Sequence, residues 1–466
     1  MSDPQPIAEL EETASVATPD DEERWAIPLG FFGKTPPFTK RQRRVFLIAT
    51  TAGFFDQYDR ALLTLALKQI QKGLQITEQA LGNMLTLVRL GYIGSLLVTP
   101  LADVFGRRRL LLYTIIAYTV FTGLAAISPT ANFFIACEML ARVFAGAEGT
   151  VALVILSEEV DAGVRGWAIG LLSALASVGF GIAALAFAGI NVVPFGWRGL
   201  YALALIPLVI IIPLRQALPE SKRFEREAAE GSRPRSIFTP LKALFGTYPG
   251  RLTMLVAAAF LGNLGGNPQG FFFSKYLQEA HGWSPANVSS LYFMGGALGI
   301  MGNIVAGRLS DRFGRRRMGA MFYLLAPVLA WFLYSSYSST MIPVPMLNRS
   351  MSAVIPIWVF HLFFDVASST IVTAYSAELF PTSYRSTAGS VLSIAGTTGG
   401  ALGFFLEGVL YRAIGSHWIA IQWLLLAWLA PGIIMLLFFP ETAGLELETI
   451  SPEDTASLPV PGGVGG

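Results

Sequence analysis

The sequence is poor in the residues from which soluble proteins build charged surfaces, disulfides and metal sites. Charged residues make up 14% of the 466 positions, whereas soluble domains carry about 25%. There is one cysteine, Cys137, and there are three histidines, so the chain has no internal disulfide and no spacing typical of a metal site. A Gly-rich phosphate-binding loop is also missing. We therefore expect no enzyme activity, no cofactor and no direct use of ATP.

Apolar residues dominate instead. They make up 53% of the chain, and the mean hydropathy is +0.55. They gather in runs of about 20 residues, which is the length of a membrane-spanning helix rather than of a barrel strand. The net charge of +2 gives no indication of nucleic-acid binding. These features predict an all-α, multi-pass protein of the cell (inner or plasma) membrane.

The apolar runs predict twelve transmembrane helices, and basic clusters orient them. The clusters at 40–44, 107–109, 222–223 and 315–317 fall on one side of the membrane if the spans alternate, which places both termini in the cytoplasm. We expect a disordered cytoplasmic tail (1–43), two six-helix bundles (44–217 and 251–439) joined by a cytoplasmic loop (218–250), and a cytoplasmic C-terminal tail (440–466). The predicted spans are 44–67, 79–101, 110–128, 131–156, 166–191, 199–217, 252–276, 287–307, 318–337, 353–377, 387–411 and 418–439.

Three landmarks repeat in the same order in the two halves. LADVFGRRR at 101–109 returns as LSDRFGRRR at 309–317, and PES at 219–221 returns as PET at 440–442. A glutamate seven residues before an arginine also occurs twice. Glycine permits a tight loop, and an acid there can pair with basic residues or cap a helix end. We expect conformational gating by Asp103, Gly106, Arg107, Glu158, Arg165, Gly307, Asp311, Arg312, Gly314, Arg315, Glu378 and Arg385.

With these motifs the sequence resembles the major facilitator superfamily over nearly everything after the N-terminal tail. The segment 307–316 is similar to the family's loop motif G-x-L-A-D-R-x-G-R-R, whereas in the first copy Thr99 and Val104 replace the leading glycine and the middle arginine. PESKRF and PETAG resemble landmarks of sugar porters, and DQYD at 56–59 resembles the D-G-F-D of aromatic-acid:proton symporters. GNLGGNPQG at 262–270 departs from the sugar porters' Q-Q-x-S-G. The resemblance implies a transporter whose two bundles rock about a central site, and we expect a monomer.

Charged residues inside predicted spans are the candidates for coupling, because such residues are costly in a membrane. Asp56, Asp59 and Arg60 share one helical face, and the helical rise places Arg89 and Arg142 near the same depth. We expect proton coupling by Asp56, Asp59, Arg142 and Glu148, with Asp59 as the carrier because Arg60 pairs more naturally with Asp56. Structural ion pairs, such as Arg142 with Glu138, are the alternative for both Arg142 and Arg89. Arg142 and Gly146 also resemble the family's fourth-helix R-x-x-x-G, tied there to proton transfer.

The second half offers mainly uncharged candidates. His361 and Asp365 are four residues apart and could relay protons, or the histidine could only fix a helix contact. Side chains beside the helix-loosening Pro268 could bind substrate where the backbone lines a cavity, and residues 271–273 could stack on a substrate ring. We expect Lys275 and Glu407 to be interfacial and His281 and His417 to lie in outer loops without partners. The substrate-binding candidates are Arg89, Tyr58, Asn263, Asn267, Gln269, His361 and Asp365.

These patterns predict a secondary transporter that takes up a small organic anion, such as an aromatic carboxylate, together with protons. The proton gradient is then the coupling source, and the partners are substrate, protons and the lipid bilayer. A proton-coupled sugar or polyol symporter and a proton-driven exporter are the alternatives. A transporter-like solute sensor is a more remote one, because it normally needs a sizeable soluble output domain.

Overall fold

The computed structural model describes residues 39–160, 162–206, 238–344, 349–445 and 450, which are almost entirely helical. A two-stranded antiparallel hairpin, in which Met341 pairs with Ser352, is the exception. The elements are α1 (Lys40–Leu65), α2 (Leu67–Gly73), α3 (Glu78–Val98), α4 (Leu101–Phe105), α5 (Arg107–Ala126), α6 (Ala131–Glu159), α7 (Ala162–Ala188), α8 (Trp197–Leu203), α11 (Phe238–Thr247), α12 (Pro249–Ala280), α13 (Pro285–Phe313), α14 (Arg315–Leu333), η2 (Ser336–Ser339), β1 (Met341–Val344), β2 (Arg349–Ser352), α15 (Val354–Glu378), α16 (Thr382–Ile414) and α17 (His417–Phe438).

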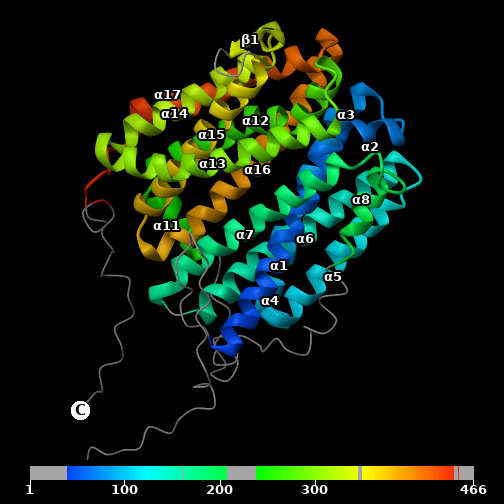
Figure 1. The fold of residues 1–466 in the computed structure, drawn as a ribbon. Helices are drawn as coiled ribbons and strands as arrows, with labels where there is room; N and C mark the ends of the chain where they lie inside the picture. The colour runs from blue at the N-terminus through cyan, green and yellow to red at the C-terminus, as the bar shows by residue number, and fades with distance from the viewer. Residues whose placement is uncertain (1–38, 161, 207–237, 345–348, 446–449, 451–466) are drawn as a thin grey trace, which may run out of the picture.

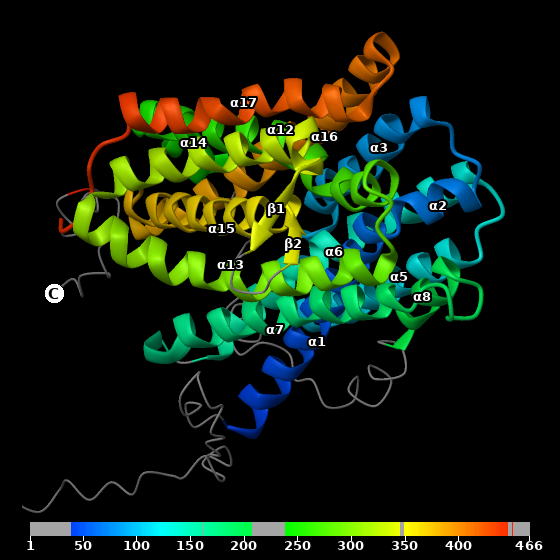
Figure 2. The ribbon, with the colours of Figure 1, turned by 45° about the horizontal axis from the view of Figure 1, so that its top comes forward.

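The helices form two groups that lie side by side, one from each half of the chain (Figure 1). In the first half α1 packs on α6 and α7, and α6 also packs on α3 and α5. In the second half α12 packs on α16 and α17, and α15 on α13 and α14. The halves meet where α3 contacts α16 and where α7 contacts α13 (Figure 2). We call the end that carries β1 and β2 the hairpin end, and the opposite end, with the loops at Gly106 and Gly314, the basic end.

Eight described helices are long and apolar enough to cross a membrane. The long helices α1, α12 and α14 fall short of that hydropathy criterion, and α1 and α12 do so because they carry polar side chains on faces that the protein covers. Such faces are tolerated in a membrane when they line a protein interior. α8 begins the predicted sixth span, and residues 207–217 of that span lie outside the described residues.

Two local expectations are corrected, and one connection contains an element that was not predicted. α12 runs continuously through Pro268, so the predicted local unwinding does not occur. α11 forms a helix within 218–250, where only a loop was expected, and residues 218–237 are not described. The connection between α14 and α15 contains the hairpin β1–β2, which has no clear sequence signal because its strands are only four residues long.

Glycines on α16 allow α12 to pack closely despite its proline. Pro268 has no N–H to donate, so the carbonyl of Leu264, four residues earlier, loses its helical partner. Gly403 approaches this carbonyl so closely that a Cβ would lie 2.1 Å from the oxygen. Gly399 meets the carbonyl of Phe260 in the same way, at 2.2 Å. Small residues four apart are the usual means by which membrane helices bring their backbones together.

Candidate functional site

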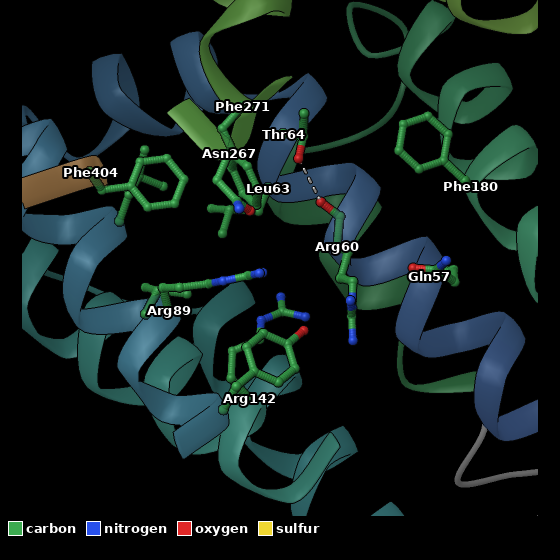
Figure 3. A pocket seen from close by; sticks show the side chains of 13 residues that line it. Gln57, Arg60, Leu63, Thr64, Arg89, Arg142, Phe180, Asn267, Phe271 and Phe404 are labelled. Carbon is green, nitrogen blue, oxygen red and sulfur yellow. Dashed lines mark hydrogen bonds between the residues drawn. The ribbon is translucent and has the colours of Figure 1, made fainter. Parts of the chain in front are cut away.

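A cavity of about 390 Å³ lies between the two halves (Figure 3). This volume lies in the range of small-molecule sites. Its wall combines residues of α1, α3, α6 and α7 with residues of α12 and α16. The lining residues are Gln57, Arg60, Leu63, Thr64, Leu85, Val88, Arg89, Tyr92, Arg142, Phe180, Asn267, Phe271 and Phe404.

Arg142 on α6 lies between this cavity and two buried carboxylates. Its Nη2 donates to Oδ2 of Asp59 and, over 2.8 Å, to Oε2 of Glu138. Asp59 and Glu138 are 0% exposed and Arg142 is 2% exposed. Removing one member of such a group is costly because it leaves an uncompensated buried charge. Nη1 of Arg142 makes no hydrogen bond, but it lies 4.0 Å from Oδ1 of Asp56, so the guanidinium faces both acids of α1.

The expectation that Asp59 is the freer acid of α1 is wrong. Asp56 does pair with Arg60, with Nη2 3.0 Å from Oδ2, as the four-residue spacing predicts. Asp59, however, binds Arg142, which is 83 positions away in the sequence. Spacing along a single helix cannot reveal a partner on another helix. The Glu138–Arg142 pair, considered as a structural alternative, is therefore part of the same network as the α1 acids.

Arg89 on α3 is different, because no carboxylate or carbonyl in the described part of the chain pairs with its guanidinium, and its Nε has no hydrogen-bond partner. Its Cζ lies 5.5 Å from the ring centre of Tyr92, which also faces Arg60 at 4.7 Å. A Cβ added to Gly400 would lie 3.2 Å from Nε of Arg89. The guanidinium groups of Arg89 and Arg142 point into the same space in Figure 3. The structural ion pair that was the alternative role for Arg89 is therefore not found in the described part of the chain.

Aromatic rings form the other side of the cavity. Phe271 lines it and meets Phe404 edge to face, with ring centres 5.2 Å apart. Phe272 and Phe273 are instead 0% exposed and do not line it; Phe273 stacks on Trp358 at 4.1 Å. Of the three phenylalanines, Phe271 therefore lies at the cavity, and Phe272 and Phe273 serve packing.

Five cavity residues with polar or aromatic side chains were expected neither to couple protons nor to contact substrate: Gln57, Thr64, Tyr92, Phe180 and Phe404. Gln57 lies within the DQYD motif, so its position beside Asp56 was an available signal. No sequence signal marks Phe180 or Phe404, because a phenylalanine in an apolar helix can equally face lipid or a neighbouring helix.

Of the uncharged candidates, Asn267 lines the cavity. Its Nδ2 donates to Oδ1 of Asn263 over 2.8 Å, so Asn263 orients it from one turn away. Gln269 is buried at 3% exposure and does not line the cavity. The hydroxyl of Tyr58 donates to the carbonyl of Leu200 over 3.1 Å, which ties α1 to α8.

The predicted His361–Asp365 relay does not form. Nδ1 of His361 lies 2.9 Å from the carbonyl oxygen of Ala326 on α14, and the ring is 2% exposed between two tryptophans, Trp358 and Trp428. Neither His361 nor Asp365 lines the cavity. The histidine therefore fixes a contact between α14 and α15, which was the structural alternative.

Glu148 on α6 carries a further buried carboxylate. It is 2% exposed, and neither of its oxygens has a hydrogen-bond partner in the described structure. Burying a carboxylate without a partner is costly, so Glu148 stays a candidate for proton coupling.

Comparison with known proteins identifies the architecture. The family model described as "Major Facilitator Superfamily" matches residues 49–360, which is more than half of the chain. The protein belongs to the major facilitator superfamily. It is therefore a multi-pass membrane protein and a secondary transporter that binds a small-molecule substrate, and it is not an enzyme.

Transporters of a muconolactone, of a hydroxybenzoate and of a sugar are among the similar proteins. A probable 4-methylmuconolactone transporter of Cupriavidus pinatubonensis is 25% identical over 90% of this chain and 96% of its own. A 4-hydroxybenzoate transporter of Pseudomonas aeruginosa is 24% identical over 83% of this chain and 89% of its own. The crystal structure of a D-xylose-proton symporter superimposes with a TM-score of 0.70 at 17% identity, covering 86% of this chain and 99% of that one. At that identity the superposition shows the fold alone.

At its basic end the transporter holds the second loop motif with a network of carboxylates. Arg315 pairs with Glu378 at 2.8 Å and with Asp311 at 3.3 Å. Glu441 of the PET landmark accepts from the backbone N–H of Arg315 over 2.7 Å and thereby caps α14. Gly314 has a φ of 97°, which favours glycine, and a Cβ there would lie 2.4 Å from the Glu441 carboxylate, which would have to shift.

The remaining gating candidates are placed only in part. Gly106 has a φ of 91°, so the first loop repeats the conformation of the second, and Arg107 is buried. Arg385 donates from Nε to the carbonyl of Phe380 over 3.1 Å. Arg312 stacks over Phe313 and Gly307 lies within α13. The side chains of Asp103, Glu158 and Arg165 lie outside the described residues.

At the hairpin end the two halves of the transporter are joined by buried polar contacts. Lys275 and Glu407 are 0% exposed, so the expectation that they are interfacial is wrong. His417 begins α17 and is buried against two carboxylates, and His281 lies 3.1 Å from Oγ of Ser338. The expectation that both histidines lack partners is therefore also wrong. Contacts of Glu78 with Lys275 and His417 link the two halves at this end.

Proposed function

We propose that the transporter carries a small organic anion, a carboxylate, in symport with protons. The observation that supports this is the charge of the cavity wall: Arg60, Arg89 and Arg142 line it, and no carboxylate does. Acids that do not line the cavity pair with Arg60 and Arg142, whereas Arg89 has no acid partner in the described residues. A planar guanidinium matches a carboxylate in two parallel hydrogen bonds. An anion at this position supplies the charge that the cavity lacks.

An aromatic carboxylate suits the rest of the wall. The rings of Phe180, Phe271 and Phe404 offer apolar faces and edges to a flat ring. The name of the 4-hydroxybenzoate transporter supports the same substrate class. A sugar would need many uncharged hydrogen-bonding groups, and Gln57, Thr64 and Asn267 are few for that purpose.

Arg142 can couple the anion to the proton. Its Nη2 holds Asp59, while Nη1 makes no hydrogen bond and has only a 4.0 Å contact with Asp56. A substrate carboxylate that draws the guanidinium into the cavity weakens its contact with Asp59. An acid that loses its cation in a buried place takes up a proton. Asp59 is then loaded when substrate is bound, and Glu148 is the second proton-accepting group.

The polar contacts that join the halves at the hairpin end fit the closed side of an alternating-access cycle. We assign the basic end, with its arginine clusters, to the cytoplasm by the positive-inside rule, so both termini are cytoplasmic. The cavity in this state then faces the cytoplasm, ready to release substrate, and the loop motifs at the basic end set the balance between the two states.

A thermal-shift screen of the purified transporter tests the substrate class. Aromatic acids, dicarboxylates and sugars are added separately, because a ligand that binds the folded state raises its melting temperature. We expect stabilisation by aromatic acids, loss of this effect in Arg89→Gln, and its retention in Arg198→Gln, whose arginine lies outside the cavity on Trp197. Stabilisation confined to sugars contradicts the proposal and favours the sugar-symport alternative.

A further inference from the structure

Four ionisable side chains join the halves at the hairpin end. Glu78 comes from the first turn of α3, in the first half. Lys275 on α12, Glu407 on α16 and His417 at the start of α17 come from the second half. We call these four residues the hairpin-end cluster. It lies apart from the cavity, because none of its members lines it.

Both ring nitrogens of His417 face carboxylates. Nδ1 contacts Oε1 of Glu407, and Nε2 lies 2.9 Å from Oε2 of Glu78. Tyr411 stacks on the imidazole with ring centres 4.0 Å apart, and Phe272 covers it at 4.9 Å. The ring cannot turn away from its two acids without losing these contacts.

This arrangement requires a proton beyond those of a neutral imidazole and two carboxylates. A neutral imidazole has one N–H donor, and its other nitrogen carries a lone pair. A lone pair facing a carboxylate oxygen is repulsive and forms no hydrogen bond. Both contacts are satisfied when the imidazole is protonated, or when one carboxylic acid donates to a neutral ring. In either form one additional proton is held between His417 and its acids.

The other charged groups around the ring do not supply that proton. Nζ of Lys275 donates to Oε1 of Glu78 over 3.1 Å and to Oε2 of Glu279 over 2.8 Å, so Lys275 is already shared between two acids. Tyr411, the titratable side chain stacked on the ring, presents its face rather than its hydroxyl. His417 and Glu407 are 4% and 0% exposed, whereas the Glu78 side chain is 39% exposed, so the site meets water on its Glu78 side.

We infer that His417, Glu407 and Glu78 form a proton-binding site that is complete only when the two halves meet at the hairpin end. Opening this end moves Glu78 away with the first half and leaves the ring with Glu407 alone. The proton is then held more weakly. Closing the end therefore takes up a proton, and acid on this side of the membrane favours the closed state. The site goes beyond the proposed function and does not depend on which substrate is carried.

The test follows the distance across the hairpin end as a function of pH. Spin labels are placed at exposed positions of the two halves, Lys72→Cys on α2 and Arg412→Cys on α16, in a Cys137→Ala background. Pulsed dipolar spectroscopy in nanodiscs then gives the ratio of closed to open molecules. One proton bound on closure raises this ratio by up to about tenfold per pH unit, and we expect a rise of about three- to tenfold per unit between pH 8 and 6.

Two variants and one control identify the group responsible. His417→Gln cannot be protonated, and Glu78→Gln lets a neutral ring accept from an amide, so both should make the ratio independent of pH. His281→Gln is the matched control: burial lowers the pKa of His281, and its partner Ser338 belongs to the same half, so the variant should keep the wild-type slope. A flat wild-type profile, or an unchanged slope in both His417→Gln and Glu78→Gln, overturns the inference.

Discussion

At the scale of single residues, the site rests on how three arginines are compensated. Arg60 is paired along its own helix and Arg142 across helices, whereas Arg89 has no acid partner in the described structure. The first pair could be predicted from the spacing of Asp56 and Arg60. The second could not, because residues 83 positions apart are brought together only by the packing of α1 on α6.

The first prediction concerns Arg142, which must hold Asp59 and Glu138 and still face the cavity. Lysine keeps the charge but has no planar fork with which to do both. We expect Arg142→Lys to bind substrate within about tenfold of wild type and to transport at least about tenfold more slowly. Binding by calorimetry and uptake into proteoliposomes separate the two effects. Wild-type uptake by both Arg142→Lys and Arg142→Gln would show that the fork is dispensable.

The second prediction separates the two proton-accepting acids. If Asp59 is the carrier, Asp59→Asn abolishes accumulation driven by a pH gradient but preserves exchange between two substrate-loaded compartments, since exchange moves no net proton. Glu148→Gln, measured in parallel, should keep part of the accumulation. If Asp59→Asn still concentrates substrate and Glu148→Gln does not, the carrier is Glu148.

At the scale of elements, α12 and α16 are held together at backbone distance. Sequence reasoning placed both helices but expected Pro268 to loosen α12. It could not show that Gly399 and Gly403 of α16 lie against the carbonyls of α12, because a glycine pattern does not name its partner. The contact keeps α12 helical and positions Asn267 and Phe271 at the cavity.

The third prediction tests this contact. A Cβ at Gly403 would lie 2.1 Å from the Leu264 oxygen, so Gly403→Ala should force the helices apart and destabilise the fold by about 1–3 kcal/mol. Gly270→Ala is the control, because nothing lies within 4 Å of its added Cβ and alanine favours a helix by about 1 kcal/mol. The free energy of unfolding of both variants is measured in detergent. Equal stability of the two variants would show that the close contact is not essential.

At the scale of the whole molecule, the two ends are held by different kinds of contact. The hairpin end joins the halves through a lysine, a histidine and two acids, of which Glu407 is buried and Glu78 is 39% exposed. These residues are far apart in the sequence, so no spacing pattern could indicate their contacts. The basic end carries the repeated loops, which the sequence revealed because duplication preserves their order. The fold was predictable from hydropathy and repeats, whereas the partners of each charge depended on the assembled halves.

The fourth prediction concerns the loop network. Asp311 is 66% exposed and pairs with Arg315 far from the cavity, so Asp311→Asn should shift the balance between states without touching substrate. We expect a slower transport rate and a substrate affinity within about threefold of wild type, because an exposed ion pair contributes at most about 1 kcal/mol. Complete loss of binding by a folded Asp311→Asn protein would contradict this separation of gating from recognition.

The central claim is that the cavity recognises a carboxylate through Arg89. It is tested most directly by calorimetric binding of benzoate and of benzamide, which have nearly the same shape but differ in charge, to wild type and to Arg89→Gln. The account predicts that wild type binds benzoate at least about tenfold more tightly than benzamide, a difference of about 1.4 kcal/mol, and that Arg89→Gln removes this preference. Equal affinity of wild type for the two compounds, or an unchanged preference in Arg89→Gln, would contradict it.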